Sequence, residues 1–136
     1  MALDDTAYIS WKEDYEIGIP EVDRQHMKLV GLINDLYLSM EVGTAAETEK
    51  VLHGLIEYTD THFTDEERLQ ERHGCPDLDA HRKLHKDLVA EALDFRKRFH
   101  DAEPGVEANL MWFLKDWLLN HIMLQDAKFA RHILGN

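Results

Sequence analysis

Apolar residues recur in steps of three and four along most of the chain, a spacing typical of amphipathic α-helices. Pro and Gly are few, and they divide this pattern into four long segments. The first segment covers residues 20–43, with Pro20 in its first turn and Gly43 at its end. Its inward positions are Val22, Leu29, Val30, Ile33, Leu36, Tyr37 and Met40. The pattern predicts one long helix with a single buried face.

Three further helices are predicted in the same way. The T-x-x-E sequence at 44–47 has the spacing of a capping box and opens a second helix, which His-Gly-Cys-Pro at 73–76 ends. Asp77 is a suitable N-cap for a third helix, which a Pro-Gly pair at 104–105 ends. The fourth helix covers about residues 106–134. The apolar inward positions of the three helices are Val51 or Leu52, Leu55, Tyr58 or Thr59, Leu69, Leu78, Leu88, Ala92, Phe95, Phe99, Leu110, Phe113, Leu114, Trp117, Leu118 and Leu124.

Four long helices joined by short loops favour an all-α fold, an antiparallel up-down-up-down four-helix bundle. We expect residues 20–136 to form this bundle as a single domain, and residues 1–19 to form an N-terminal arm packed across it. Large apolar side chains of the arm include Tyr8, Ile9, Trp11, Tyr15, Ile17 and Ile19. The chain has one cysteine, Cys75, so it forms no intrachain disulfide, and we expect this thiol in an exposed turn.

The formal charge of −12 argues against a nucleic-acid partner and against an anionic membrane surface, because no basic stripe is present to neutralise phosphates. No apolar run approaches the ~20 residues that a membrane-spanning helix needs, so we expect no membrane insertion. The acidic N-terminus lacks the features of a secretory signal. We therefore expect a cytoplasmic monomer.

Seven groups of another kind lie on the inward faces of all four helices. They are five histidines and two carboxylates: His26, His62, Glu66, His81, His85, His121 and Asp126. Side chains four residues apart on a helix share a face, so one helix can offer two donors to one buried point. An apolar core does not accommodate seven such groups unless something binds them. The simplest ligand for this set is a pair of metal ions.

The topology brings the seven groups to one level, because the starts of the first and third helices lie beside the ends of the second and fourth. Glu66 and Asp126 could each bridge two metal ions, with a solvent-derived oxygen as a third bridge. Three histidines would then complete six-coordination at one ion, and two would leave the other ion with an open position, as in reactive sites. Imidazole and carboxylate donors suit Fe, Zn, Cu or Ni better than Mg or Ca.

One spacing departs from the helical period. His121 and Asp126 are five residues apart, which places them roughly 140° apart on an ideal α-helix. A π-turn restores their alignment, and such turns are frequent at functional sites. We therefore predict a wide turn over residues 121–126. The other histidines lack comparable neighbours and are predicted to lie in solvent or in loops: His53, His73, His100 and His132.

Five motifs of the chain are similar to those of the hemerythrin family, in particular its bacterial members. They are W-x-x-x-Y at 11–15, D-R-Q-H at 23–26, H-F-T-D-E-E at 62–67, H-R-K-L-H at 81–85 and H-I-M-L-Q-D at 121–126. The resemblance runs from about residue 8 to residue 130. The chain departs from the family at Cys75, where family members often have an aromatic residue before the proline. That position is not a ligand, so the departure leaves the metal assignment intact.

The resemblance implies a non-haem di-iron centre, two Fe ions with an oxo or hydroxo bridge. The histidines of the six-coordinate iron would be His81, His85 and His121. Those of the other iron would be His26 and His62, while Glu66 and Asp126 would bridge. O2 would bind reversibly at the open iron, beside an apolar wall formed by Phe63, Trp117, Leu118 and Ile122. The implied function is O2 transport, storage or delivery to an oxygen-consuming enzyme, with no catalysis by the chain itself.

The residues alone leave other functions open, namely O2 or redox sensing, and an enzyme that scavenges peroxide or NO. We expect no signalling module to accompany the bundle, and this expectation favours a carrier over a sensor. A ferritin-like oxidase is disfavoured because the chain contains no E-x-x-H sequence. A metal-free structural bundle is disfavoured because Glu66 and Asp126 would be buried without partners.

Overall fold

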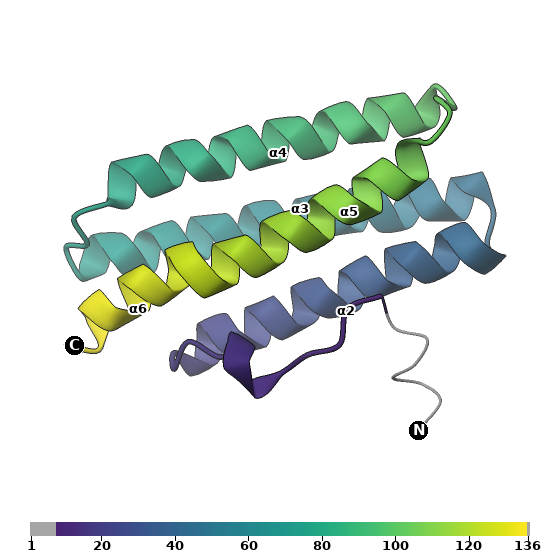
Figure 1. The fold of residues 1–136 in the computed structure, drawn as a ribbon. Helices are drawn as coiled ribbons and strands as arrows, with labels where there is room; N and C mark the ends of the chain where they lie inside the picture. The colour runs from purple at the N-terminus through teal and green to yellow at the C-terminus, as the bar shows by residue number, and fades with distance from the viewer. Residues whose placement is uncertain (1–7, 136) are drawn as a thin grey trace.

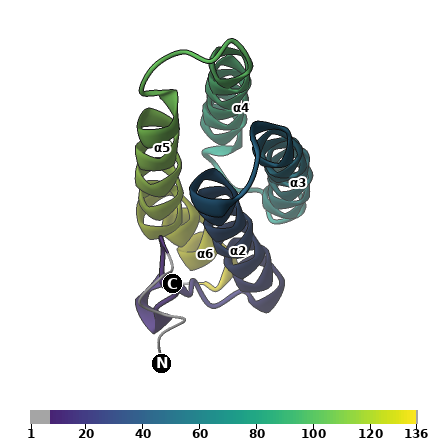
Figure 2. The ribbon, with the colours of Figure 1, turned by 90° about the vertical axis from the view of Figure 1, so that its right-hand side faces the viewer.

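The computed structural model describes residues 8–135, apart from the side chains of Ile122 and Met123. The helices form four long rods, and Figure 1 shows that successive rods run in opposite directions. The first three rods are α2 (Pro20–Val42), α3 (Ala45–Arg72) and α4 (Leu78–His100). The fourth runs continuously through α5 (Val106–Asn120), the π-helix η2 (His121–Asp126) and α6 (Ala127–Ile133). Seen end-on in Figure 2, the rods surround a common core, and the predicted antiparallel four-helix bundle is confirmed.

Local signals set most helix ends where the sequence places them. The capping box of α3 forms, because the Glu47 N–H donates to Oγ1 of Thr44 at 3.2 Å and the Glu47 carboxylate accepts from the Thr44 N–H at 3.1 Å. Asp77 occupies the N-cap of α4, but its side chain makes no capping hydrogen bond. Its backbone (φ −97°, ψ 17°) is not extended as an N-cap usually is. Gly105 supports the left-handed conformation (φ 78°) that precedes α5.

The described part of the N-terminal arm, residues 8–19, packs on the bundle as expected. It includes the short 3-10 helix η1 (Glu13–Tyr15). Hydrogen bonds fasten both ends of this segment to α2: the Ile9 N–H donates to Oδ1 of Asn34 at 2.8 Å and Nδ2 of Asn34 donates to the Ile9 carbonyl at 2.9 Å, while the Ile17 N–H donates to Oδ1 of Asp23 at 2.8 Å. Residues 1–7 lie outside the described residues.

Apolar side chains fill the bundle on both sides of a polar layer. The larger cluster extends from this layer toward the α2–α3 and α4–α5 turns and includes Leu29, Ile33, Leu36, Leu52, Leu55, Phe63, Phe95, Leu110, Leu114 and Leu118. A smaller cluster lies beside the α3–α4 turn and contains Ile19, Val22, Leu69, Cys75, Phe129 and Ala130. Within residues 8–135, no helix is long and apolar enough to cross a membrane.

The prediction that Cys75 is exposed was wrong, since this residue is only 8 % exposed. After α3 the chain turns through Gly74 at φ +60°, and the Cys75 N–H donates to the Gln70 carbonyl at 3.0 Å. This turn directs the thiol inward, where it packs in the smaller apolar cluster. Loop position therefore does not make Cys75 a surface residue.

Candidate metal centre

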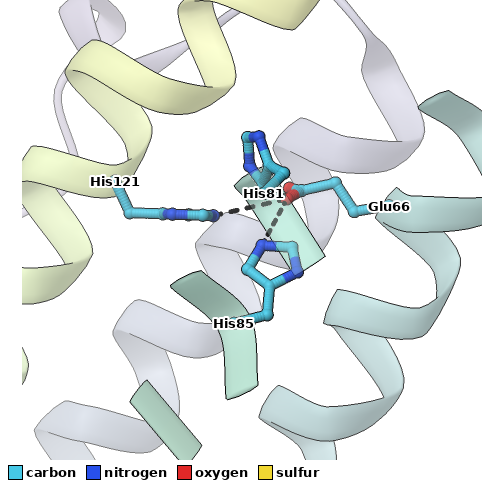
Figure 3. Close-up of side chains that lie close together, drawn as sticks. All are labelled: Glu66, His81, His85 and His121. Carbon is cyan, nitrogen blue, oxygen red and sulfur yellow. Dashed lines mark hydrogen bonds and ion pairs between the residues drawn. The ribbon is translucent and has the colours of Figure 1, made fainter. Parts of the chain in front are cut away.

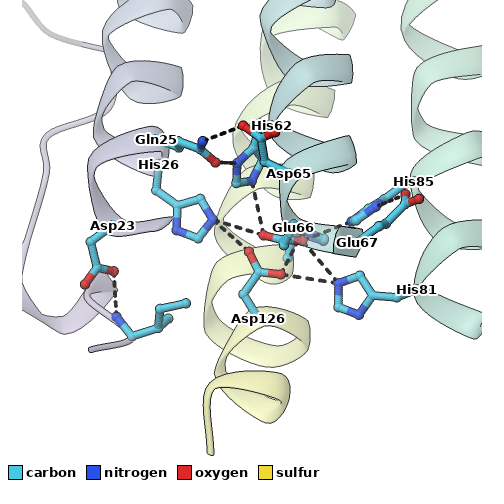
Figure 4. Close-up of polar contacts among 12 residues, drawn as sticks. Asp23, Gln25, His26, His62, Asp65, Glu66, Glu67, His81, His85 and Asp126 are labelled. Atoms are coloured by element: carbon cyan, nitrogen blue, oxygen red, sulfur yellow. Dashed lines mark hydrogen bonds and ion pairs between the residues drawn. The ribbon is translucent and has the colours of Figure 1, made fainter. Parts of the chain in front are cut away.

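The polar layer contains all seven residues singled out from the sequence. One comes from α2, two each from α3 and α4, and two from η2, and they face one another across the core (Figures 3 and 4). None is more than 5 % exposed: His26, His62, Glu66, His81, His85, His121 and Asp126. Residues up to 100 positions apart in the chain therefore meet at one buried point.

Glu66 presents one carboxylate oxygen to each of two groups of histidines. Its Oε1 lies 3.2–3.4 Å from the Nε2 atoms of three of them, His81, His85 and His121 (Figure 3). Its Oε2 lies 3.2 Å from Nε2 of His62 and 3.7 Å from Nε2 of His26. The single carboxylate thus faces both groups at once.

Asp126 divides its two oxygens in the same way. Its Oδ1 lies 2.9 Å from Nε2 of His121 and 3.3 Å from Nε2 of His81, and its Oδ2 lies 2.7 Å from Nε2 of His26. Two sets of donors therefore lie side by side, each with its atoms within 4.8 Å of one another, and Glu66 belongs to both. Two adjacent metal ions bridged by carboxylates need this arrangement.

Several of these donor atoms are buried without a hydrogen-bond partner among the described residues: Nε2 of His26, His62 and His85, Oε2 of Glu66 and Oδ2 of Asp126. Nε2 of His26 and Oδ2 of Asp126 are close together, but they are not aligned as donor and acceptor. Since buried polar atoms are normally paired, atoms that converge on shared points fit bound cations. The mixed imidazole and carboxylate set suits a transition metal.

The electrostatics of the metal-free cluster also fit bound cations. Burial by itself lowers the pKa of His26, but the adjacent carboxylates of Asp126 and Glu66 outweigh it and raise this pKa to about 9. Burial also lowers the pKa of His81 and of His121, but the same two carboxylates outweigh it and raise these pKa values to about 9 and about 10. Metal ions must displace these protons, so metal affinity should fall as the pH falls.

The two carboxylates show the complementary behaviour. Burial raises the pKa of Glu66, but the charge of His62 and hydrogen bonds from other histidines lower it well below its usual range. Burial and the charge of Glu66 raise the pKa of Asp126, yet His121 and His26 lower it overall. Both groups are therefore ionised at neutral pH, in the form that binds a metal.

Two residues that the sequence reasoning missed orient the histidine rings. Oε1 of Gln25 lies 2.6 Å from Nδ1 of His62, and Nε2 of Gln25 donates to Asp65 at 3.0 Å (Figure 4). A histidine that donates through Nδ1 presents the lone pair of Nε2 to the centre, as metal-binding histidines usually do. Gln25 directly precedes a ligand candidate in the chain, but its partner on α3 is not visible in the sequence.

Glu67 orients the ring of His85 in the same way, but with a charged group. Its Oε2 lies 2.8 Å from Nδ1 of His85, and its Oε1 lies 3.5 Å from Nε of Arg82. The two outer contacts thus differ in charge: a neutral amide supports His62, and a carboxylate supports His85. The sequence feature that could have identified Glu67 is the pair of consecutive acids Glu66 and Glu67, since the first faces inward and the second reaches the adjacent helix.

The wide turn predicted between His121 and Asp126 is confirmed, because η2 is a π-helix over these six residues. It brings both side chains to the same face, as an i, i+5 pair in a π-turn allows. The same turn overturns the prediction that Leu124 faces inward, since this residue is 59 % exposed. Leu124 is three residues after His121 and would face the core in a regular α-helix, but the wider turn rotates it outward.

Aromatic and aliphatic side chains cover one side of the centre, where the ring centroid of Phe63 is 5.8 Å from that of His62 and 5.6 Å from that of His121, so that it lies beside both groups of histidines. Phe63 stacks on His85, with ring centroids 3.8 Å apart, and Trp117 meets Phe63 edge-on at 5.7 Å. Leu118 is fully buried in the adjoining cluster. The side chain of Ile122, the fourth residue expected in this wall, lies outside the described residues.

The remaining histidines lie on the surface, as predicted: His53, His73, His100 and His132 are all exposed. His53 lies 3.4 Å from Glu57, and His100 lies 2.8 Å from Glu49. None of them belongs to either donor set.

Comparison with known proteins agrees with this geometry. The family model described as the hemerythrin HHE cation binding domain matches residues 17–133. A bacteriohemerythrin from Stenotrophomonas maltophilia is 31 % identical over 127 residues, which cover 93 % of this chain and 82 % of that protein. A bacteriohemerythrin from Pseudomonas aeruginosa is 34 % identical over 124 residues, which cover 91 % and 80 % of the two chains.

A solved structure has the same fold. The crystal structure of a wild-type hemerythrin superposes with a TM-score of 0.85 at 30 % identity, covering 93 % of this chain and 98 % of that one. The family match extends over nearly the whole bundle and includes the positions of all seven donor residues. This chain therefore belongs to the hemerythrin family.

Proposed function

We propose that this protein binds O2 reversibly at a non-haem di-iron centre. The observation that carries the proposal is the division of both carboxylates, each with one oxygen toward the group of His81, His85 and His121 and the other toward the group of His26 and His62. Membership of the hemerythrin family supports iron as the metal, and the names of the relatives, bacteriohemerythrin and myohemerythrin, support O2 as the ligand.

In this proposal each residue has a defined role. Glu66 and Asp126 would each contribute carboxylate oxygens to both irons. The histidines that would hold one iron are His81, His85 and His121, and those that would hold the other are His26 and His62. When bound, the two ferrous ions supply electrons and an open coordination position for O2.

The protein's own contribution is orientation and exclusion of water. Gln25 and Glu67 hold the rings of His62 and His85 so that their Nε2 atoms face the centre. Phe63, Trp117 and Leu118 are buried beside it, and an apolar wall limits the access of water and protons that would lead to oxidised iron. We keep Ile122 in this wall as a prediction.

We favour binding over catalysis because a centre with only two carboxylates is less able to stabilise high-valent iron than a carboxylate-rich one. Transport, storage or delivery of O2 to an oxygen-consuming enzyme follows from this proposal. The monomeric state and the cytoplasmic location expected from the sequence stay predictions.

The decisive experiment is an optical spectrum of the anaerobically reduced, iron-loaded protein, then in air, then after removal of O2 under vacuum, with iron counted per chain. Charge-transfer bands that appear in air and vanish under vacuum, at two irons per chain, are the expected result. Bands that persist under vacuum would instead indicate oxidation, as in a scavenging enzyme or redox sensor. Glu66→Gln should abolish the bands, and the exposed Glu71→Gln is the matched control.

A further inference from the structure

A polar pocket separate from the metal centre lies beside it, at the end of the bundle that contains the α3–α4 turn. Its volume is about 260 Å³. Its walls come from α3, the turn, α4 and the last rod, and include Gln70, Cys75, Asp77, His81, Lys128 and Arg131. Only His81 among these residues belongs to the metal centre.

Gln70 is the first sign that this pocket holds a ligand. The residue is fully buried, yet neither Oε1 nor Nε2 of its side chain has a hydrogen-bond partner among the described residues. A buried amide without partners is unfavourable, so the missing partner is expected to be a molecule in the pocket.

The charges at the pocket indicate the chemistry of that molecule. The chain carries a net charge of −12, but the charged residues lining this pocket are two cations, Lys128 and Arg131, and one acid, Asp77. Neither cation forms an ion pair within residues 8–135. Burial, and then the charge of Asp77, raise the pKa of the Cys75 thiol, so it adds no negative charge at neutral pH. The pocket therefore favours an anion.

The ring of His81 connects the pocket to the metal centre. Its Nε2 faces the carboxylates of Glu66 and Asp126 (Figure 4), while its Nδ1 forms no hydrogen bond with any described residue. Metal-binding histidines usually donate this outer N–H to an acceptor. Gln25 and Glu67 supply that acceptor for two other histidines, and for His81 the available space is the pocket.

We propose that this pocket binds a small oxyanion, which accepts hydrogen bonds from the Gln70 amide and from Nδ1–H of His81 and lies near Lys128 and Arg131. The anion then has the same orienting effect on His81 as Glu67 has on His85. Cys75 lines the pocket with a small side chain, so a larger side chain at this position would fill part of the space. The proposal goes beyond O2 binding and does not depend on it.

The test is a titration of the full-length, zinc-loaded protein with inorganic phosphate, and separately with acetate, followed by NMR of the Gln70 side-chain amide. Zinc keeps the protein diamagnetic, so the readout is independent of O2 binding. We expect the Gln70 amide signals to shift saturably with one or both probes. A response to phosphate alone or to acetate alone identifies which oxyanion geometry the site accepts. No shift with either probe, or an equal shift with chloride, overturns the proposal.

Variants distinguish anion binding in this pocket from anion binding at the metal ions. Cys75→Tyr should abolish the saturable shift by filling the space, and the double variant Lys128→Gln/Arg131→Gln should weaken binding by about tenfold or more. The matched control is Lys83→Gln/Lys86→Gln, which removes two exposed cations of α4 that line a different groove. Equal affinity in the Lys128/Arg131 variant and in this control would refute the site. Because all four lysines and arginines are on the surface, these variants should fold.

Discussion

Removal of the metal ions should make the stability of this protein depend on pH in the neutral to alkaline range. In the metal-free protein, the pKa of His26 is raised from 6.5 to about 9 by the buried carboxylates of Asp126 and Glu66, against the effect of burial. A raised pKa means that the folded state binds the proton more tightly than the unfolded state. The stabilisation is therefore complete below pH 6.5 and is lost as the pH rises through about 9.

The magnitude follows from the size of these shifts. At about 1.4 kcal/mol per pKa unit, His26 alone contributes about 3 kcal/mol. His81 and His121 have similarly raised pKa values, but the three histidines share two carboxylates. We therefore expect a total loss of about 3–6 kcal/mol between pH 6.5 and 10. With a denaturant slope of about 2 kcal/mol/M, the urea midpoint should fall by about 1.5–3 M.

The assay is urea unfolding at constant ionic strength, on chelator-treated and on metal-loaded protein. The loaded protein should change little over this range, because its imidazoles are occupied by metal rather than by protons. Asp126→Asn should reduce the slope of the metal-free protein, and the surface variant His53→Gln should not. A flat profile for the metal-free protein, or an equal slope with metal bound, would refute the idea that imidazolium–carboxylate pairs hold the empty site together.

Three further changes test separate parts of the structure. Leu118→Gln should accelerate autoxidation of the oxygenated protein, because it places a polar group in the buried apolar wall; a rate equal to that of the wild type, measured optically, would argue against this role. Deletion of the exposed Leu124 leaves His121 and Asp126 four residues apart, which a regular α-turn places on one face, so we expect metal stoichiometry to be retained. Loss of metal from this deletion would mean that the wide turn itself is required. Thr44→Ala removes the capping box of α3 and should lower stability by about 1 kcal/mol, seen as a lower melting temperature; no change would show that α3 does not need its cap.

Features of this protein that depend on local spacing follow from the amino-acid sequence alone. Helical periodicity and the Thr44–Glu47 capping box specify where helices form, because both act within one or two turns. The alternating direction of the helices then predicts that His26, Glu66 and the other donors meet at one level. Even the π-turn was predictable, since a five-residue separation of two inward ligands is incompatible with a regular α-helix.

Which atoms face one another depends instead on the packing of the helices. The sequence does not reveal that Gln25 reaches His62 or that Glu67 reaches His85, because each contact joins different helices. It gave the wrong exposure for Leu124, whose direction depends on how the wide turn rotates the helix, and for Cys75, which a tight turn directs into the core. The division of the Glu66 oxygens between two groups of histidines likewise requires the packed bundle. Such contacts depend on the rotation and depth of whole helices, which the chain fixes only when its core closes.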